Sequence, residues 1–165
     1  YPGKTAGAVP ALPGVGETGR GKALMDRVQL TIPLKPRGKE RPRWSEKIKR
    51  MYTPATTTDY EDLIKLIYRQ RYGTQMFPQG VPLDIRIRAY YPIPKSDTLA
   101  VRAKKLTGAI RPTVKPDWDN IGKIVADALN KIAYHDDAQI VDSQTRKFYS
   151  DNPRVEILIQ IAGGQ

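Results

Sequence analysis

Residues 115–141 have the sequence KPDWDNIGKIVADALNKIAYHDDAQIV, and this stretch decides most of the fold. Pro116 favours extended backbone at the residue before it, Lys115, and Asp119 is a good candidate for the N-cap of a helix. From there the apolar residues recur at helical spacing and form one wide stripe. The stripe consists of Ile121, Ile124, Val125, Ala128, Leu129 and Ile132. We therefore predict a helix over residues 119–133, followed by a strand over residues 138–149.

The segments on either side alternate apolar and polar residues, which is typical of half-buried strands. This pattern predicts strands over residues 27–34, 83–91 and 154–161, with a turn at residues 151–153 (Asp-Asn-Pro) before the last strand. A second amphipathic stripe, with a capping box from Thr58 to Glu61, predicts a helix over residues 58–72. The order β-α-β-α-β-β predicts a single α+β domain with a mixed sheet and two main helices.

Three further segments lack such periodicity. Residues 35–50 and 92–115 are rich in Lys, Arg and Pro, and we expect both to be basic loops. Residues 1–25 are dominated by Gly, Pro, Ala and Thr, and we expect a flexible tail or a remnant of an upstream or cloning-derived sequence. The domain would then run from residue 26 to residue 165.

The composition points to a polyanionic partner. The chain has 165 residues, with 28 Lys and Arg against 17 Asp and Glu, so its formal net charge is +11. Such a balance is typical of nucleic-acid-binding proteins. The absence of cysteine excludes disulfides, thiolate zinc sites and cysteine nucleophiles, and the single histidine, His135, excludes a multi-histidine metal site. No apolar run approaches the roughly 20 residues of a membrane span, and a cytoplasmic setting fits.

Four carboxylates nevertheless gather within residues 117–137 of this basic chain: Asp117, Asp119, Asp136 and Asp137. Clustered carboxylates repel, and a bound cation turns the repulsion into attraction. Aspartates are ligands that Mg²⁺ prefers, so a metal site is one interpretation. The other is that one pair caps the helix and the other forms a solvated turn. A 15-residue helix would separate the pairs by about 22 Å, and the residues alone do not show how that gap closes.

Three motifs together resemble the core of the RusA family of Holliday junction resolvases. They are Lys115-Pro-Asp-Trp-Asp-Asn-Ile-Gly-Lys123, Asp127-Ala-Leu129 and Asp136-Asp-Ala-Gln-Ile-Val141. The resemblance implies a homodimeric, Mg²⁺-dependent endodeoxyribonuclease, for which Mn²⁺ can substitute. Such an enzyme makes paired symmetric nicks at four-way DNA junctions in recombination and repair, in a prokaryote or a phage. It also implies that both acidic motifs assemble into one site.

By the same resemblance, the catalytic residues are Asp117, Asp119, Asp137 and Lys123, and Asp136 joins the three aspartates as a metal ligand. Lys123 follows Asp119 by four residues, so it lies on the same helix face and can neutralise a carboxylate or reach a phosphate. The expected phosphate contacts are Arg41, Arg43, Lys104, Lys105, Arg111 and Lys115.

Two alternatives to the junction resolvase stay open at this point. One is a basic nucleic-acid-binding protein whose aspartates hold no metal, and the other is a nuclease for other branched DNA or RNA. Trp44 and Tyr52 are candidates for stacking on an unpaired base, with packing in the core as the competing interpretation.

Overall fold

The computed structural model describes residues 24–47 and 49–163, so residues 1–23 of the expected tail lie outside it. Four strands form the main sheet in the order β1-β6-β4-β5. β6 is antiparallel to both β1 and β4, whereas β4 and β5 are parallel. The prediction of a mixed sheet is therefore confirmed. The strands are β1 (Arg27–Ile32), β4 (Leu83–Pro92), β5 (Ile140–Ser150) and β6 (Arg154–Ile161).

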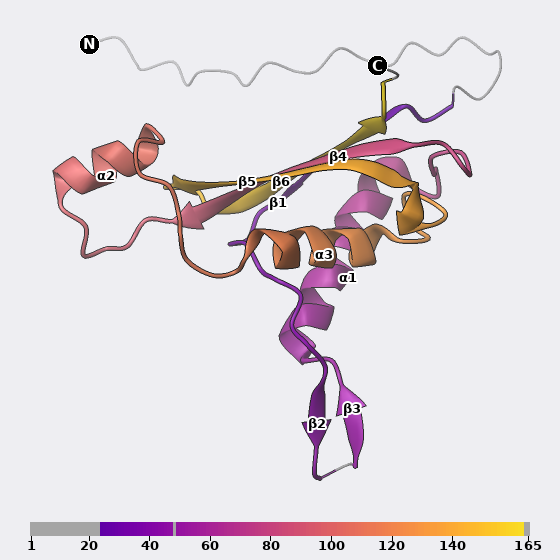
Figure 1. Cartoon of the computed structure of the whole chain (residues 1–165), viewed down its shortest axis with the longest axis horizontal. Helices are drawn as coiled ribbons and strands as arrows, with labels where there is room; N and C mark the ends of the chain where they lie inside the picture. The colour runs from indigo at the N-terminus through magenta and orange to yellow at the C-terminus, as the bar shows by residue number, and fades with distance from the viewer. Residues whose placement is uncertain (1–23, 48, 164–165) are drawn as a thin grey trace, which may run out of the picture.

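Two helices, α1 (Ala55–Tyr72) and α3 (Trp118–Leu129), lie together against one face of this sheet (Figure 1). The predicted apolar stripe of α3 is buried there, and Ile121 and Ile124 are at most 1% exposed. The alternating strand residues, such as Val28 and Ile157, close the core from the sheet side. α1 begins earlier than predicted, after Pro54 and without a side-chain cap, so the expected capping box is wrong.

The two main helices are present as predicted, and residues 92–115, which we expected to be a loop, contain a third, shorter helix. α2 (Leu99–Leu106) packs beside β5 at one end of the sheet (Figure 1). The Thr98 hydroxyl accepts a hydrogen bond from the Val101 amide and caps its first turn. A short 3₁₀ helix, η1 (Asp137–Gln139), connects the end of α3 to β5.

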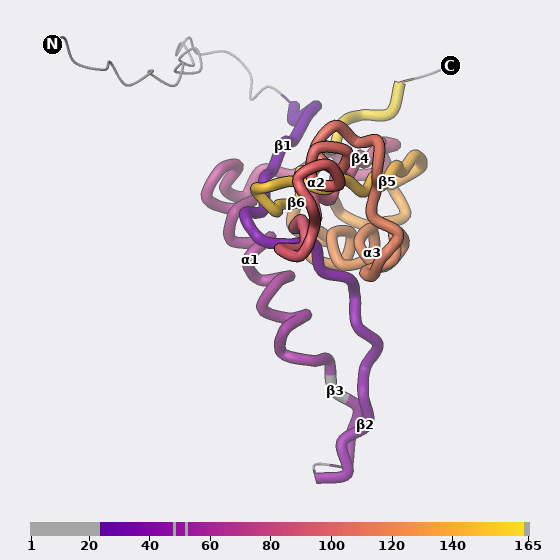
Figure 2. Tube along the Cα trace, turned by 90° about the vertical axis from the view of Figure 1, so that its left-hand side faces the viewer, coloured from indigo at the N-terminus to yellow at the C-terminus, as the bar shows by residue number. Residues whose placement is uncertain are grey.

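Residues 35–50 contain a second departure from the prediction. β2 (Arg43–Ser45) and β3 (Arg50–Tyr52) form a separate two-stranded antiparallel sheet. This hairpin projects from the body of the molecule beyond the start of α1, as both views show (Figure 1, Figure 2). Residues 33–42, which we call the strap, run from β1 along the helices to this hairpin.

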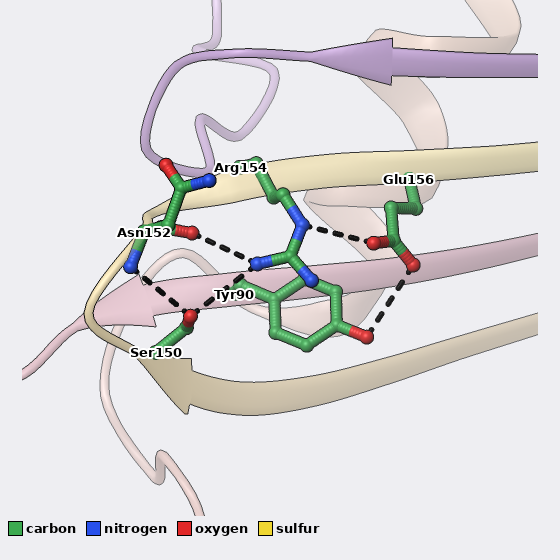
Figure 3. A network of polar contacts seen from close by, with 5 residues as sticks. All are labelled: Tyr90, Ser150, Asn152, Arg154 and Glu156. Atoms are coloured by element: carbon green, nitrogen blue, oxygen red, sulfur yellow. Dashed lines mark hydrogen bonds and ion pairs between the residues drawn. The ribbon is translucent and has the colours of Figure 1, made fainter. Parts of the chain in front are cut away.

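The turn between β5 and β6 is present as predicted, and a polar network braces it (Figure 3). The Arg154 guanidinium donates to Glu156, to the Ser150 hydroxyl and to the Asn152 carbonyl. It also stacks 3.8 Å from the centre of the Tyr90 ring. These contacts fix the end of the sheet that lies nearest to the start of α3. Within residues 24–47 and 49–163, no helix combines the length and the apolar composition needed to span a membrane.

Candidate functional site

The first acidic pair lies where α3 begins. Asp117 is the N-cap residue, in extended conformation, and Asp119 lies in the first turn of the helix. Both side chains are exposed, and neither forms an ion pair with any residue that the structure describes. Lys123 is exposed one turn further along the face of Asp119. The positive end of the helix dipole favours the ionised form of carboxylates placed here.

The turn before Asp117 is held from the sheet side by two residues that sequence reasoning missed. The Tyr91 hydroxyl donates to the Pro116 carbonyl at 2.8 Å, and the Lys147 ammonium donates to the Val114 carbonyl at 2.5 Å. Burial lowers the pKa of Lys147, and the nearby Asp117 carboxylate opposes that shift. Burial also raises the pKa of Tyr91, with Asp117 adding to the effect. These two hydrogen bonds therefore fix the backbone of the turn that carries Asp117.

The strap holds α3 from the other side. The Lys39 amide donates to the Asn120 carbonyl at 2.9 Å. Its ammonium bridges the two helices, 2.5 Å from Glu61 of α1 and 3.0 Å from Asp127 of α3. Burial lowers the pKa of Lys39, but the two carboxylates outweigh it, so the pKa is raised overall. The strap, α1 and α3 are thus joined by one lysine.

The second acidic pair lies beyond the opposite end of α3. Asp136 caps η1, and its carboxylate accepts the Ala138 amide at 2.8 Å. This backbone hydrogen bond, followed by the neighbouring Asp137 carboxyl and by Lys131, lowers the pKa of Asp136. Asp137 is exposed and forms no ion pair within the described part of the chain. Asp136 therefore has a structural role in the turn, while the Asp137 carboxylate stays open to solvent.

A single chain does not bring the two pairs together. α3 has 12 residues and is about 18 Å long, with Asp117 and Asp119 at its start and Asp137 past its end. Among residues 24–47 and 49–163, no three His, Cys, Asp or Glu side chains are close enough to share a metal ion. Mg²⁺ is often bound by one or two carboxylates together with water and substrate phosphate. The first acidic pair alone fits that donor set.

The expected DNA contacts differ in availability. Arg41, Arg43 and Lys104 are exposed, as is Lys115 directly before the acidic turn. The Arg111 guanidinium is also exposed, but it donates to the Lys147 carbonyl and stacks on Phe148.

Two other expectations change with the structure. Lys105 is less available for DNA than we expected, because this side chain is 9% exposed, pairs with Asp97 at 2.6 Å and covers the Tyr149 ring. Core packing is excluded for Trp44, which is 53% exposed on the hairpin. The side chain of Tyr52 lies outside the described part of the structure.

Comparison with known proteins covers most of the chain. A family model described as endodeoxyribonuclease RusA matches residues 33–160, from the strap to the end of β6. The "Uncharacterized protein YqaN" of Bacillus subtilis (strain 168) is 36% identical over 140 residues, which are 82% of this chain and 97% of that protein. The "Crossover junction endodeoxyribonuclease rusA" of Lactococcus phage r1t is 31% identical over 86 residues, which are 52% of this chain and 59% of that protein.

Proposed function

This chain belongs to the RusA family of endodeoxyribonucleases, and from that premise we propose that it resolves four-way DNA junctions by paired symmetric nicks. One observation carries the proposal. Two aspartates that form no ion pair with a described residue, Asp117 and Asp119, lie at the start of a helix in a chain whose net charge is +11. Branched DNA formed during recombination and repair in a prokaryotic cell, or in a phage infecting one, is the substrate this function implies. The enzyme would accordingly work in the cytoplasm.

The family is divalent-metal dependent, and we propose Mg²⁺ as the ion, with Mn²⁺ as a substitute. Asp117 and Asp119 would hold it, because their carboxylates are exposed and form no ion pair with a described residue. When bound, such an ion supplies a nucleophile from water and stabilises the charge that develops on the phosphate. Tyr91 and Lys147 hold the turn that orients Asp117. Lys123 would stabilise negative charge on the phosphate in the transition state.

We further propose that the enzyme is a homodimer in which the second acidic motif acts across the subunit boundary. Asp137 lies past the far end of α3 from Asp119, about 18 Å of helix away. β5 is an edge strand of the sheet, and α3 packs beside it. Two copies related by a two-fold axis perpendicular to this edge would set their α3 helices antiparallel. Asp137 of the partner subunit would then approach Asp117 and Asp119.

The first test is cleavage of a synthetic four-way junction with and without Mg²⁺. Wild type is expected to nick two opposing strands symmetrically and only with the metal. Asp119→Asn is expected to bind the junction as tightly but to cleave at least 100-fold more slowly, since it loses a metal ligand. Asp59→Asn, a change at an exposed aspartate of α1, is the matched control. Binding without nicking in wild type would establish a non-catalytic binding protein instead. Flaps, linear duplex and structured RNA, assayed in parallel, test selectivity.

The second test is complementation between inactive variants. Asp119→Asn and Asp137→Asn are each expected to be inactive. If the site is shared between subunits, the mixed dimer contains one site that carries both changes and one site that carries neither. Mixing should therefore restore nicking of one strand per junction. If the mixture stays as inactive as its components, although light scattering shows that subunits exchange, the shared site is refuted.

A further inference from the structure

A groove of about 320 Å³ lies between the strap and the turn that opens α3. The strap forms one wall, and the turn that carries Asp117 forms the other. Its polar lining includes Lys35, Arg37, Lys39, Lys115, Asp117 and Asn120. The groove therefore opens directly beside one of the two proposed metal ligands, on the side where the strap crosses the helix.

Three cations of this groove have no counter-ion. Lys35, Arg37 and Lys115 form no ion pair and no side-chain hydrogen bond with any residue among 24–47 and 49–163. Lys39 differs, because its ammonium is held by carboxylates of both helices. The groove is lined by two carboxylates, Asp117 and, at its end, Glu40. Glu40 already pairs with Arg43 at 2.8 Å. The groove is thus locally cationic next to an acidic site.

Arg37 is the best placed of the three to bind a ligand tightly. Arg37 is half-buried and follows the buried Pro36, whereas Lys35 and Lys115 are exposed. A Cβ atom added at Gly38 would lie 2.8 Å from the Pro116 Cβ, so the strap touches the α3 turn at this point. Lys39 ties the strap on the other side of it. The backbone of Arg37 is therefore fixed, and less conformational entropy is lost when its guanidinium binds.

We propose that this groove binds the phosphodiester next to the scissile one on the strand being cut, with the Arg37 guanidinium as its main contact. A guanidinium can donate two parallel hydrogen bonds to phosphate oxygens, which fixes orientation as well as position. Holding the neighbouring linkage places the scissile phosphate against Asp117 and Asp119, where carboxylates alone would repel it. The inference rests on the proposed function, since it locates the cut strand relative to that site.

Arg37→Gln tests the contact, with Arg69→Gln as the matched control. Arg69 is an exposed arginine near the end of α1, so the control removes the same charge outside the groove. Junctions carry one neutral methylphosphonate linkage, moved through the three linkages on either side of the cleavage position. Cleavage of each junction by each protein is measured with Mg²⁺, and binding is measured in EDTA. The binding arm keeps the groove testable even if the protein does not cleave.

For wild type and Arg69→Gln, a methylphosphonate at one linkage adjacent to the cut should reduce kcat/KM and affinity about tenfold, the value of one charge-assisted hydrogen bond. Arg37→Gln should lose about tenfold on the unmodified junction and change less than twofold with that methylphosphonate. Arg37→Lys should lose part of that tenfold, because it keeps the charge but not the two parallel hydrogen bonds. The inference is overturned if Arg37→Gln matches Arg69→Gln, or if its loss multiplies with that of every methylphosphonate. Absence of cleavage in wild type would instead refute the proposed function, while the binding arm still decides on the groove.

Discussion

Replacing Gly38 by alanine tests whether the strap sets the position of the α3 turn. A Cβ atom at residue 38 would lie 2.8 Å from the Pro116 Cβ and 3.0 Å from the Asn120 Cβ. Both neighbours are Cβ atoms attached directly to backbone, so neither can swing aside as the tip of a long side chain would. The strap or the turn must move by several tenths of an ångström. The 2.9 Å hydrogen bond from the Lys39 amide to the Asn120 carbonyl lies next to the clash and would be strained.

Overpacking of this kind costs about 1–3 kcal/mol, which corresponds to a Tm lower by about 3–9 °C for a domain of this size. Gly122→Ala is the matched control, because a Cβ there would meet only the Thr145 hydroxyl at an ordinary 3.7 Å. Gly122 lies inside α3, where alanine is the better helix former by about 0.8–1 kcal/mol. The same chemical change should therefore destabilise at residue 38 and stabilise at residue 122. Urea unfolding and calorimetry of the three proteins measure both.

Activity separates a local packing defect from a role in positioning. At a temperature where all three proteins are folded, Gly38→Ala should cleave junctions at least tenfold more slowly than wild type, while Gly122→Ala should cleave normally. A Gly38→Ala protein that melts within 1 °C of wild type would show that the strap is not fixed against the turn. A variant that melts lower but cleaves at the wild-type rate would show that the strap contact does not position Asp117.

Three further substitutions have opposite or selective expected effects. Lys39→Met should destabilise by about 1–3 kcal/mol, since two carboxylates lose their partner. The folded-state pKa of Lys39 is raised above its ordinary value of 10.5, so this contribution is complete below pH 10.5 and is lost as the pH rises through the folded value. Urea unfolding at pH 8 and pH 11 measures it, and a gap that stays constant would contradict the bridge. Lys104→Ala should weaken junction binding at an unchanged Tm, whereas Lys105→Ala should lower the Tm with less effect on binding; the reverse pattern would place the DNA contact at the buried lysine. Trp44→Ala should reduce the preference for junction over linear duplex by about 5- to 100-fold in competition gel shifts, as loss of one base stack predicts. An equal loss on both DNAs would argue against stacking.

Strict alternation made the sheet predictable from sequence. Residues 154–161 were predicted as a strand with the bounds that β6 shows, because Val155, Ile157 and Ile159 can face a core only in extended backbone. The stripe of α3 predicted its helix for the same kind of reason. α3 ends at Leu129, four residues before the predicted end of the helix, because residues 130–134 form a turn that is held by contacts with the helix. The Tyr134 hydroxyl donates there to the Ala126 carbonyl at 2.8 Å.

Features set by long-range contacts were not predictable in this way. α2 is short, and its buried side depends on Lys105, which pairs with Asp97 and covers the Tyr149 ring. Because the sequence does not show these contacts, the basic composition of this segment favours a loop. The strap has no periodicity at all, and its place is fixed by Lys39 contacting residues of two helices far apart in sequence. Lys147 and Tyr91 support the acidic turn from two different strands. Within the candidate site, the aspartates and Lys123 carried a local signal in the sequence.

The acidic side chains divide into two groups, and the division explains why so basic a chain keeps aspartates exposed. Most carboxylates in the described part of the chain neutralise a neighbouring cation, as Glu61 and Asp97 do. Seven carboxylates form no such ion pair there, although the chain has 28 Lys and Arg: Asp117, Asp119 and Asp137, and also Asp26, Asp59, Asp136 and Asp142. Asp117, Asp119 and Asp137 are exposed, so pairing them would stabilise the fold by at most about 1 kcal/mol. A carboxylate about 5 Å from a phosphate charge repels it by about 3 kcal/mol at an effective dielectric of 20. If Asp117 and Asp119 hold the metal as we propose, the scissile strand would approach them only together with a cation, whereas the groove beside Arg37 would attract the same strand without one. DNA binding would then depend on the metal at the acidic pair but not at the groove, so DNA could bind before the site is able to cut it.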